Sequence, residues 1–195
     1  MKKKLSIVLG ILLLVAGCGY HFPGQATALP GGGSKLRIGR FENRSREPGL
    51  ENEVARAMED EVARRGIFQI VKENNDADLV LEGTINSLDT IPVAFSTSDS
   101  ALQYQTVMTI SAALRDPRSG RVVWQVAGLH EDDSYGAVSN TVVTESSAFA
   151  QSTLNPNDLN RLAEIQLSES QRRDAIERVL TNTSRDIYTS MVEDF

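Results

Sequence analysis

The residue with the most distinctive chemistry in this chain is its single cysteine, Cys18. It follows Ala16 and Gly17, after an uncharged and mostly apolar segment from Leu5 to Val15, and lysines occupy positions 2–4. A basic start, an apolar run of about 7–15 residues and small residues at a cleavage point are typical of a secretory signal. The apolar run is too short for a membrane-spanning helix, which needs about 20 apolar residues. The pattern therefore predicts export.

A lone cysteine directly after Ala16 and Gly17 resembles the lipobox of bacterial lipoproteins. In that class the cysteine thiol carries a diacylglycerol, the signal is cut before the cysteine, and the new amino terminus is acylated. The resemblance implies a lipoprotein signal peptide over residues 1–17, S-diacylglycerol and an N-acyl group on Cys18, and no other cofactor. Because stable anchoring takes more than one acyl chain, three chains would hold the protein at a membrane. The alternative is an ordinary signal peptide with an incidental cysteine.

The residue after the cysteine bears on location. Lipoproteins that stay at the inner membrane often carry Asp there, whereas this chain has Gly19. By resemblance to that sorting rule, the protein is expected at the outer membrane, on its periplasmic side. Residues 25–34 are rich in Gly and Ala, and Gly31–Gly33 is typical of flexible coil. We predict that residues 18–34 are the lipidated N-terminus and a flexible tether.

The rest of the chain offers few groups for catalysis or metal binding. Its two histidines, His21 and His130, lie far apart and lack the spacing of metal ligands to Cys, Asp or Glu. The sequence contains no nucleophile elbow and no phosphate-binding glycine loop. The run from Glu131 to Asp133 could chelate calcium, but a solvated charge run is the favoured interpretation. The sequence therefore predicts that the protein is not an enzyme.

The net charge of the chain limits the classes of partner that it is expected to bind. Loss of residues 1–17 removes three lysines and changes the formal net charge from −6 to −9. Such an acidic domain is a poor candidate for binding nucleic acid, whose phosphates require Lys and Arg. With Cys18 acylated, no thiol remains for a disulfide, so packing must supply the stability.

Residues 35–195 are predicted to form a single domain that opens with a strand over residues 36–41. Four apolar residues then recur every fourth position and predict an amphipathic helix that ends before Gly66, which suits a left-handed C-terminal position. A second strand is expected over residues 67–71. The helix periodicity rests on Leu50, Val54, Met58 and Val62.

Alternating apolar residues predict three further strands, over residues 78–86, 102–114 and 122–127. Asp116–Gly120 suits a turn, because Pro presets φ and Gly accepts positive φ, so the last two strands form a long antiparallel hairpin. Residues 89–100 are expected to be an irregular connection rich in Ser and Thr. Beyond Asp133 the periodicity is lost until Asn155, and we predict a mobile or partner-dependent segment there.

Two helical segments end the chain. The first begins at Pro156 and weakens at Ser168 and Ser170, whereas the second carries apolar residues at three- and four-residue steps from Ile176 to Met191. The predicted fold class is α+β. We expect a two-layer sandwich in which two main helices cover one face of a mostly antiparallel sheet of four to five strands.

Several segments, taken in order, resemble the lipopolysaccharide-assembly lipoprotein family, LptE. The resemblance covers nearly all of the chain after the signal and implies a non-enzymatic role. Members of this family sit as a plug inside the outer-membrane β-barrel LptD, help it to assemble, and help to pass lipopolysaccharide to the outer leaflet. The family fold, two helices on a four-stranded sheet, agrees with the pattern above. The matching segments are Gly17–Phe22, Phe41–Glu51, Ala77–Ile85 and Tyr104–Trp124.

The resemblance also directs attention to basic residues. Some family members contact lipopolysaccharide through basic residues near the start of the long hairpin, but Phe95–Asp99 here contains no Arg or Lys. Arg115, Arg118 and Arg121 surround the other hairpin turn and are our candidates for lipopolysaccharide contact, with solvated turn arginines as the alternative. The Gln, Thr and Ser residues on one hairpin face would hydrogen-bond the polar wall of a barrel.

A second class of function stays open. Lipoproteins that activate a peptidoglycan synthase, and scaffolds similar to the curli-secretion lipoprotein, also open with a strand ending in Phe-Glu-Asn, as in Phe41–Asn43, and continue into a helix. A large heat-modifiable β-barrel should co-purify with the chain under the first interpretation. Under the second, a synthase or a self-assembled ring is expected.

Overall fold

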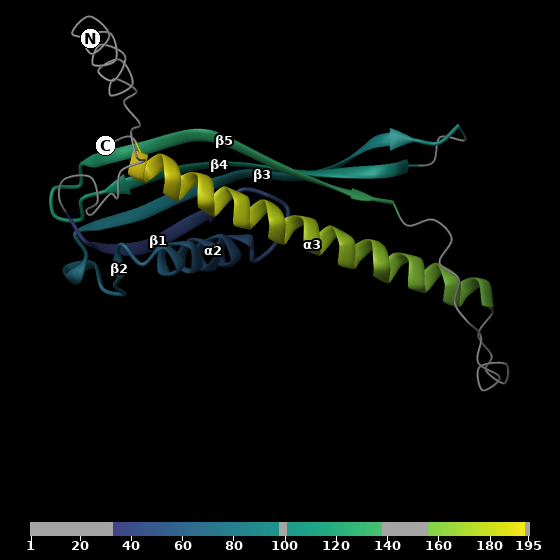
Figure 1. Ribbon diagram of the computed structural model, residues 1–195, viewed down its shortest axis with the longest axis horizontal. Helices are drawn as coiled ribbons and strands as arrows, with labels where there is room; N and C mark the ends of the chain where they lie inside the picture. Colours follow the sequence, from purple (N-terminus) through teal and green to yellow (C-terminus); the bar gives the residue numbers. More distant parts are fainter. Residues whose placement is uncertain (1–32, 98–100, 138–155, 194–195) are drawn as a thin grey trace, which may run out of the picture.

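The computed structural model describes residues 33–97, 101–137 and 156–193, with side chains in the last range from residue 164 onward. Cys18, the predicted signal peptide, nearly all of the predicted tether and residues 138–155 lie outside the described residues. Figure 1 shows the order of the elements. They are β1 (Lys35–Asn43), α2 (Leu50–Arg65), β2 (Gln69–Ile70), a 3₁₀ turn (Asn74–Asp76), β3 (Leu79–Phe95), β4 (Ala101–Arg115), β5 (Val122–Gly136) and α3 (Pro156–Glu193).

The five strands form one mixed sheet in the order β2-β1-β3-β4-β5. The β3–β4 and β4–β5 pairs are antiparallel, as predicted for the hairpin, but β1 pairs in parallel with both β2 and β3. The prediction of a mostly antiparallel sheet is therefore wrong for its first half. The reason is that α2 carries the chain back to the end of the sheet where β1 began, so β2 and β3 run in the same direction as β1.

Helix α2 forms as its periodicity predicts. Leu50, Val54, Met58 and Val62 are each at most 2% exposed and face the sheet. The helix ends at Gly66, which has φ of 67° and donates its amide to the Val62 carbonyl over 3.1 Å. Glutamates in the first turn and arginines in the last complement the helix dipole.

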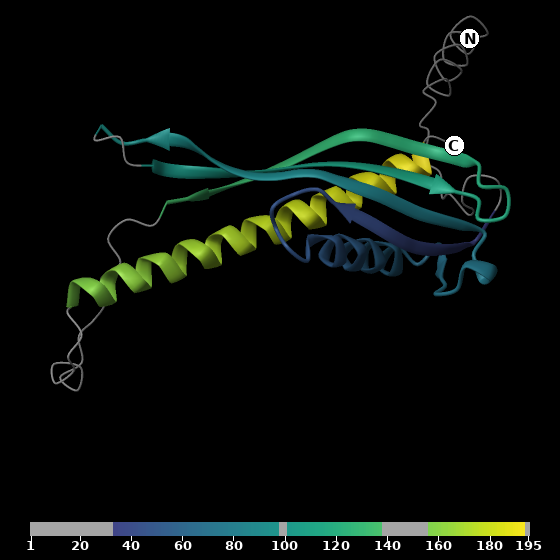
Figure 2. The same cartoon turned by 180° about the vertical axis from the view of Figure 1, so that it is seen from behind.

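Helix α3 is a single element of 38 residues, about 57 Å long at 1.5 Å per residue. The two helical segments expected at the end of the chain are one helix, because Ser168 and Ser170 lower its apolar character without breaking its backbone. Figures 1 and 2 show that its C-terminal half packs on the sheet beside α2, while its N-terminal half diverges from the strands. An ion pair joins the C-terminal half of α3 to β5, since the Arg178 guanidinium lies 2.7 Å from the Asp133 carboxylate.

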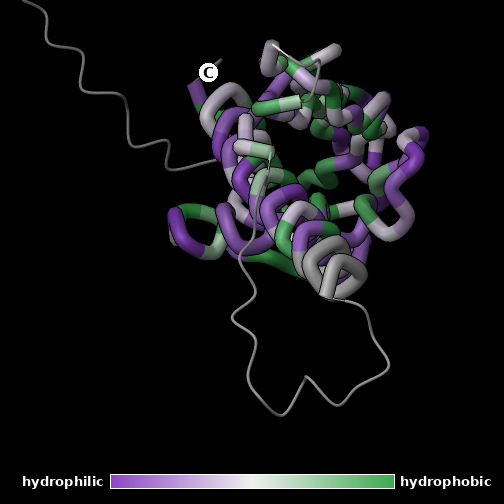
Figure 3. Tube along the Cα trace, turned by 90° about the vertical axis from the view of Figure 1, so that its right-hand side faces the viewer, coloured by the Kyte–Doolittle hydropathy of each residue, from purple (hydrophilic) through white to green (hydrophobic). Residues whose placement is uncertain are grey.

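The α+β class and the pair of helices on one sheet face are confirmed. Figure 3, viewed along the long axis, shows the sheet curled toward the helices, with the core enclosed between them. Both helices and four strands contribute to this one core. In the described part of the chain, neither helix has an apolar stretch long enough to cross a membrane.

Strand β3 is longer than expected. Residues 89–95, predicted as an irregular connection, continue β3, and Phe95 still pairs with Ala101. The last pair between β1 and β3 is Asn43 with Ile85, so the rest of β3 extends beyond β1. Pro92 is tolerated there because an edge strand can lack one amide donor. Alternation alone missed this part of the strand because three register shifts interrupt it.

Candidate functional site

The β4–β5 turn is a tightly hydrogen-bonded structure at one end of the sheet. The Asp116 carboxylate accepts hydrogen bonds from the Arg118 amide over 2.8 Å and from the Ser119 hydroxyl over 2.7 Å. These bonds, the hydroxyl foremost, hold the pKa of Asp116 below its usual value. Gly120 completes the turn with φ of 71°. The predicted turn is thus confirmed, with a conformation set by Asp116.

The structure brings the three candidate arginines to this end, but gives them different surroundings. Arg115 donates to the Gly120 carbonyl over 2.6 Å, and its guanidinium lies 3.7 Å from the Glu82 carboxylate. Arg115 therefore stabilises the turn. Arg118 and Arg121 are exposed, and within the described residues neither side chain makes a hydrogen bond or ion pair. Contact between any of the three and lipopolysaccharide stays a prediction.

The folded domain begins beside the same turn. The Asp78 carboxylate accepts hydrogen bonds from the backbone amides of Ser34 and Lys35, each over 3.0 Å. These two bonds lower the pKa of Asp78, and the charge of Arg118 lowers it further. The predicted tether therefore joins the domain next to Arg118.

The opposite end of the molecule exposes apolar side chains. Among the described residues, most of the exposed large hydrophobic side chains lie on the distal β3–β4 hairpin or on the diverging half of α3. Exposed apolar clusters commonly mark surfaces that bind partners. We call the hairpin group the distal patch; it comprises Ile91, Val93, Phe95 and Leu102, which are 44–55% exposed. The sequence pattern does not reveal this patch, because it predicts an irregular connection over residues 89–100, although the apolar residues 93–95 are a signal.

The sheet face away from the helices is polar, as predicted for the hairpin. Many of its side chains already pair across the strands: the Gln105 amide donates to Asp132 over 2.6 Å, and Thr109 lies 3.1 Å from the His130 ring nitrogen. His130 thus has a neighbouring hydroxyl as partner. In the described residues no group of His, Cys, Asp and Glu has the arrangement of a metal site.

The charge run on β5 is not simply solvated, which corrects part of its interpretation. Alternate residues of a strand share a face, so Glu131 and Asp133 both face α3 while Asp132 faces outward. Burial, followed by a hydrogen bond and charge repulsion from Asp186 on α3, raises the pKa of Glu131 to about 7. Glu131 therefore keeps its proton to a higher pH than an ordinary glutamate does.

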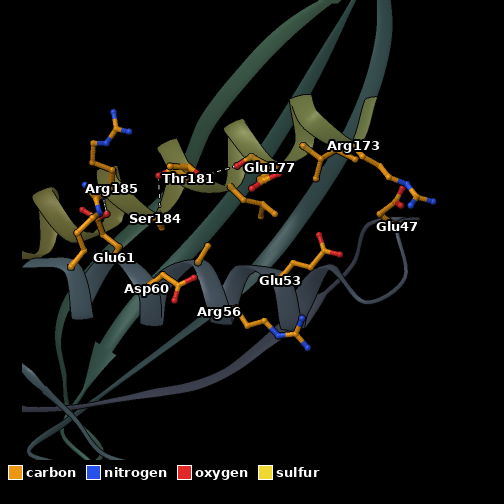
Figure 4. Close-up of a pocket in the computed structure, with 14 residues that line it drawn as sticks. Glu47, Glu53, Arg56, Asp60, Glu61, Arg173, Glu177, Thr181, Ser184 and Arg185 are labelled. Carbon is orange, nitrogen blue, oxygen red and sulfur yellow. Dashed lines mark hydrogen bonds and ion pairs between the residues drawn. The ribbon is translucent and has the colours of Figure 1, made fainter. Parts of the chain in front are cut away.

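A groove of about 750 Å³ separates α2 from α3 on the side away from the sheet. Figure 4 shows charged side chains along both rims. The floor contains apolar residues from both helices, including Ala57, Ile176 and Leu180. Glu61, only 2% exposed, pairs with Arg64 and Arg65 on its own helix. The groove thus combines a narrow apolar floor with balanced charge, and its contacts give no preference for one ligand.

Solved structures of several bacterial lipoproteins are similar to this chain. A minor lipoprotein from Acinetobacter baumannii is 17% identical, with a TM-score of 0.43 over 79% of this chain and 90% of that one. The rare lipoprotein B from Shewanella oneidensis is 16% identical, with a TM-score of 0.35 over 77% and 99% of the two chains. The LpoB C-terminal domain from Salmonella enterica is 12% identical, with a TM-score of 0.35 over 55% and 84%.

No curated protein sequence matches the chain significantly. A protein-family model does match it: the model described as LptE, lipopolysaccharide-assembly, covers residues 34–191. This range includes every strand of the sheet and nearly all of α3.

Proposed function

Because the chain belongs to the LptE family of lipopolysaccharide-assembly proteins, we propose that it plugs and helps to assemble an LptD-type outer-membrane β-barrel. In this role it takes part in lipopolysaccharide transport to the outer leaflet. The protein is a lipoprotein without catalytic activity, anchored through Cys18 on the periplasmic side of the outer membrane. The family match over almost the whole folded domain is the observation that carries the proposal.

The dimensions of the domain suit a plug. The 17 residues of β3 extend about 56 Å at 3.3 Å per residue. The apolar band of an outer-membrane barrel is only about 25 Å tall, so a domain of this length lying along the barrel axis would project beyond the band. The polar sheet face matches the polar interior of such a barrel, where side-chain amides and hydroxyls meet hydrogen-bonding partners.

The distal patch also needs a partner surface. Phe95 and Leu102 are about half exposed, and they lie at the end of β3 and the start of β4, opposite the tether end of the sheet. In the proposed complex, apolar side chains of the barrel or its loops cover this patch. Because the lipid holds the opposite end, the hairpin points away from the anchor and into the lumen. A preformed surface of this kind gives barrel strands a template during closure.

The basic residues predicted to meet lipopolysaccharide are Arg115, Arg118 and Arg121. Arg115 is engaged by the turn, so Arg118 and Arg121 are the side chains available for phosphate groups. They lie at the tether end, on the side from which lipopolysaccharide would approach in this proposal.

Co-purification tests the proposal. The full-length lipoprotein, tagged at its C-terminus, is extracted from membranes in mild detergent and captured. A large β-barrel whose gel mobility changes on heating is the expected partner. Capture of a peptidoglycan synthase, or a self-assembled ring of this chain alone, overturns the proposal in favour of an activator or scaffold. An equally abundant tagged lipoprotein from the same membrane serves as the control.

A further inference from the structure

The tether reaches the folded domain at the β4–β5 turn. Ser34 and Lys35 are held on the Asp78 carboxylate, and a Cβ at Gly33 would lie only 2.7 Å from the Asp78 Cβ. The charge of Arg118 acts on the same carboxylate. These contacts fix the point at which the tether leaves the domain, and they place that point beside the turn arginines.

The length of the tether limits how far this end can lie from a membrane. Cys18 and Gly33 are separated by 15 residues. A chain of this length spans at most about 54 Å when fully extended, at roughly 3.6 Å per residue. If Cys18 carries lipid, as the proposed function requires, the end of the domain that carries the turn therefore stays within about 54 Å of the headgroups of the anchoring leaflet.

The charges at this end favour an anionic surface. Three of the acidic groups at this end have partners: Asp78 accepts the two backbone amides at the tether end, Asp116 holds the turn, and Glu82 lies next to Arg115. Glu73 and Asp76, in or beside the 3₁₀ turn, are exposed. Arg118 and Arg121 project from the turn with exposed side chains. Arginine binds phosphate through paired, charge-assisted hydrogen bonds. The domain as a whole is acidic, so this end is the part suited to contact anionic lipid.

We propose that Arg118 and Arg121 bind the phosphates of anionic phospholipids in the leaflet that holds the acyl chains of Cys18. The inference rests on the proposed anchor. The two contacts orient the domain with the β4–β5 turn toward the membrane and the distal patch away from it. Weak contacts suffice, because the anchor keeps the arginines at a high effective concentration near the headgroups. The orientation presents the β3–β4 hairpin to a partner before the partner encloses it.

Fluorescence quenching in vesicles tests this orientation. The full-length lipidated protein carries a fluorophore at Asn75→Cys, in the 3₁₀ turn close to Asp78, or at Gln103→Cys on the distal hairpin. It is reconstituted in phosphatidylcholine vesicles whose headgroups carry a nitroxide quencher, alone, with phosphatidylglycerol, or with lipopolysaccharide. Quenching at position 75 is expected to increase with phosphatidylglycerol, while position 103 stays unquenched. High salt should reverse the increase, because screening weakens exposed charge contacts.

The double variant Arg118→Ser/Arg121→Ser supplies the decisive comparison. The ratio of membrane-facing to other orientations should fall by roughly tenfold or more when both charges are lost near an anionic surface. The matched control is Arg46→Ser/Arg56→Ser, which removes two exposed arginines away from the turn and should leave quenching unchanged. Equal melting temperatures of the two variants check their folding.

Each other outcome has a defined meaning. The inference is overturned if quenching at position 75 does not depend on phosphatidylglycerol, or if the double substitution does not reduce it. Either result leaves the proposed function intact. An increase with lipopolysaccharide alone assigns the arginines to the transported lipid instead. A chain that fails to float with any vesicle overturns both the inference and the anchored function on which it rests.

Discussion

Gly83 of β3 lies directly against the aromatic ring of Phe41 on β1. A Cβ at position 83 would stand 2.6 Å from Phe41 Cε1 and 2.7 Å from the Ser111 carbonyl oxygen. Phe41 is 2% exposed and is among the largest fully buried side chains. Because Gly83 has no side chain, the Phe41 ring can pack against its backbone within the core.

The substitution Gly83→Ala is expected to destabilise the domain by about 1–3 kcal/mol, because overpacking forces buried groups out of position. The urea concentration at half-unfolding, measured on the lipid-free domain in parallel with wild type, reports this change. Gly136→Ala is the control, since no atom lies within 4 Å of the Cβ it would add. Equal midpoints for wild type and Gly83→Ala would show that the ring can move without cost.

The carboxyl pair between Glu131 and Asp186 predicts an unusual dependence of stability on pH. The pKa of Glu131 is raised from 4.5 to about 7 in the folded state. Between these values the unfolded chain loses the proton that the folded chain keeps, so the free energy of unfolding falls as pH rises. Because the site is partly open to water, we expect a loss of about 1–2 kcal/mol between pH 4.5 and 7.

Glu131→Gln should remove most of this fall, and urea unfolding at a series of pH values measures it. Gln keeps the hydrogen bond to Asp186 but has no proton to lose. Glu59→Gln, an exposed substitution on α2, is the control and should retain the wild-type slope. Parallel slopes for wild type and Glu131→Gln would remove the carboxyl pair as the cause.

The distal patch predicts a separation between stability and partner binding. Phe95→Lys and Leu102→Lys change side chains that are 55% and 48% exposed. Each substitution should therefore alter the free energy of unfolding by only about 0.5 kcal/mol. Capture of the barrel should nevertheless fall by roughly tenfold, because buried aromatic anchors dominate interface energies. Val122→Lys, which changes an exposed apolar residue at the opposite end of the sheet, is the matched control. Undiminished capture by the double variant would place the interface elsewhere.

A local element could be predicted from the sequence when the role of each of its residues depends on neighbours along the chain. Helix α2 is an example, since Leu50 through Val62 and the terminal Gly66 specify its face and its end without reference to the sheet. The β4–β5 turn is another, because Asp116, Ser119 and Gly120 complete its hydrogen bonds among themselves. The candidate arginines were therefore placed correctly at one turn.

Properties that depend on distant segments were not predictable in this way. The parallel direction of β1 depends on where α2 returns the chain, and the continuation of β3 past Pro92 depends on pairing with β4. The surroundings of Glu131 depend on Asp186 of α3, which comes 55 residues later in the chain. The pattern predicts a strand only over residues 122–127 and a solvated charge run at Glu131, whereas burial and the Asp186 carboxylate on α3 raise the pKa of Glu131.

The lipid anchor predicts two distinct outcomes for substitutions at neighbouring residues. In the wild type, mass spectrometry of the N-terminal peptide should find Cys18 as the first residue with three acyl chains. Cys18→Ala removes the acceptor thiol, so the chain should lose its lipid and its place in the outer-membrane fraction.

Gly19→Asp is the sharper test, because by the sorting rule it keeps the lipid but holds the protein at the inner membrane. Sucrose-gradient separation of the two membranes distinguishes these variants. A bare thiol on Cys18 in the wild type would contradict the anchor, and Gly19→Asp protein that still reaches the outer membrane would contradict the sorting rule alone.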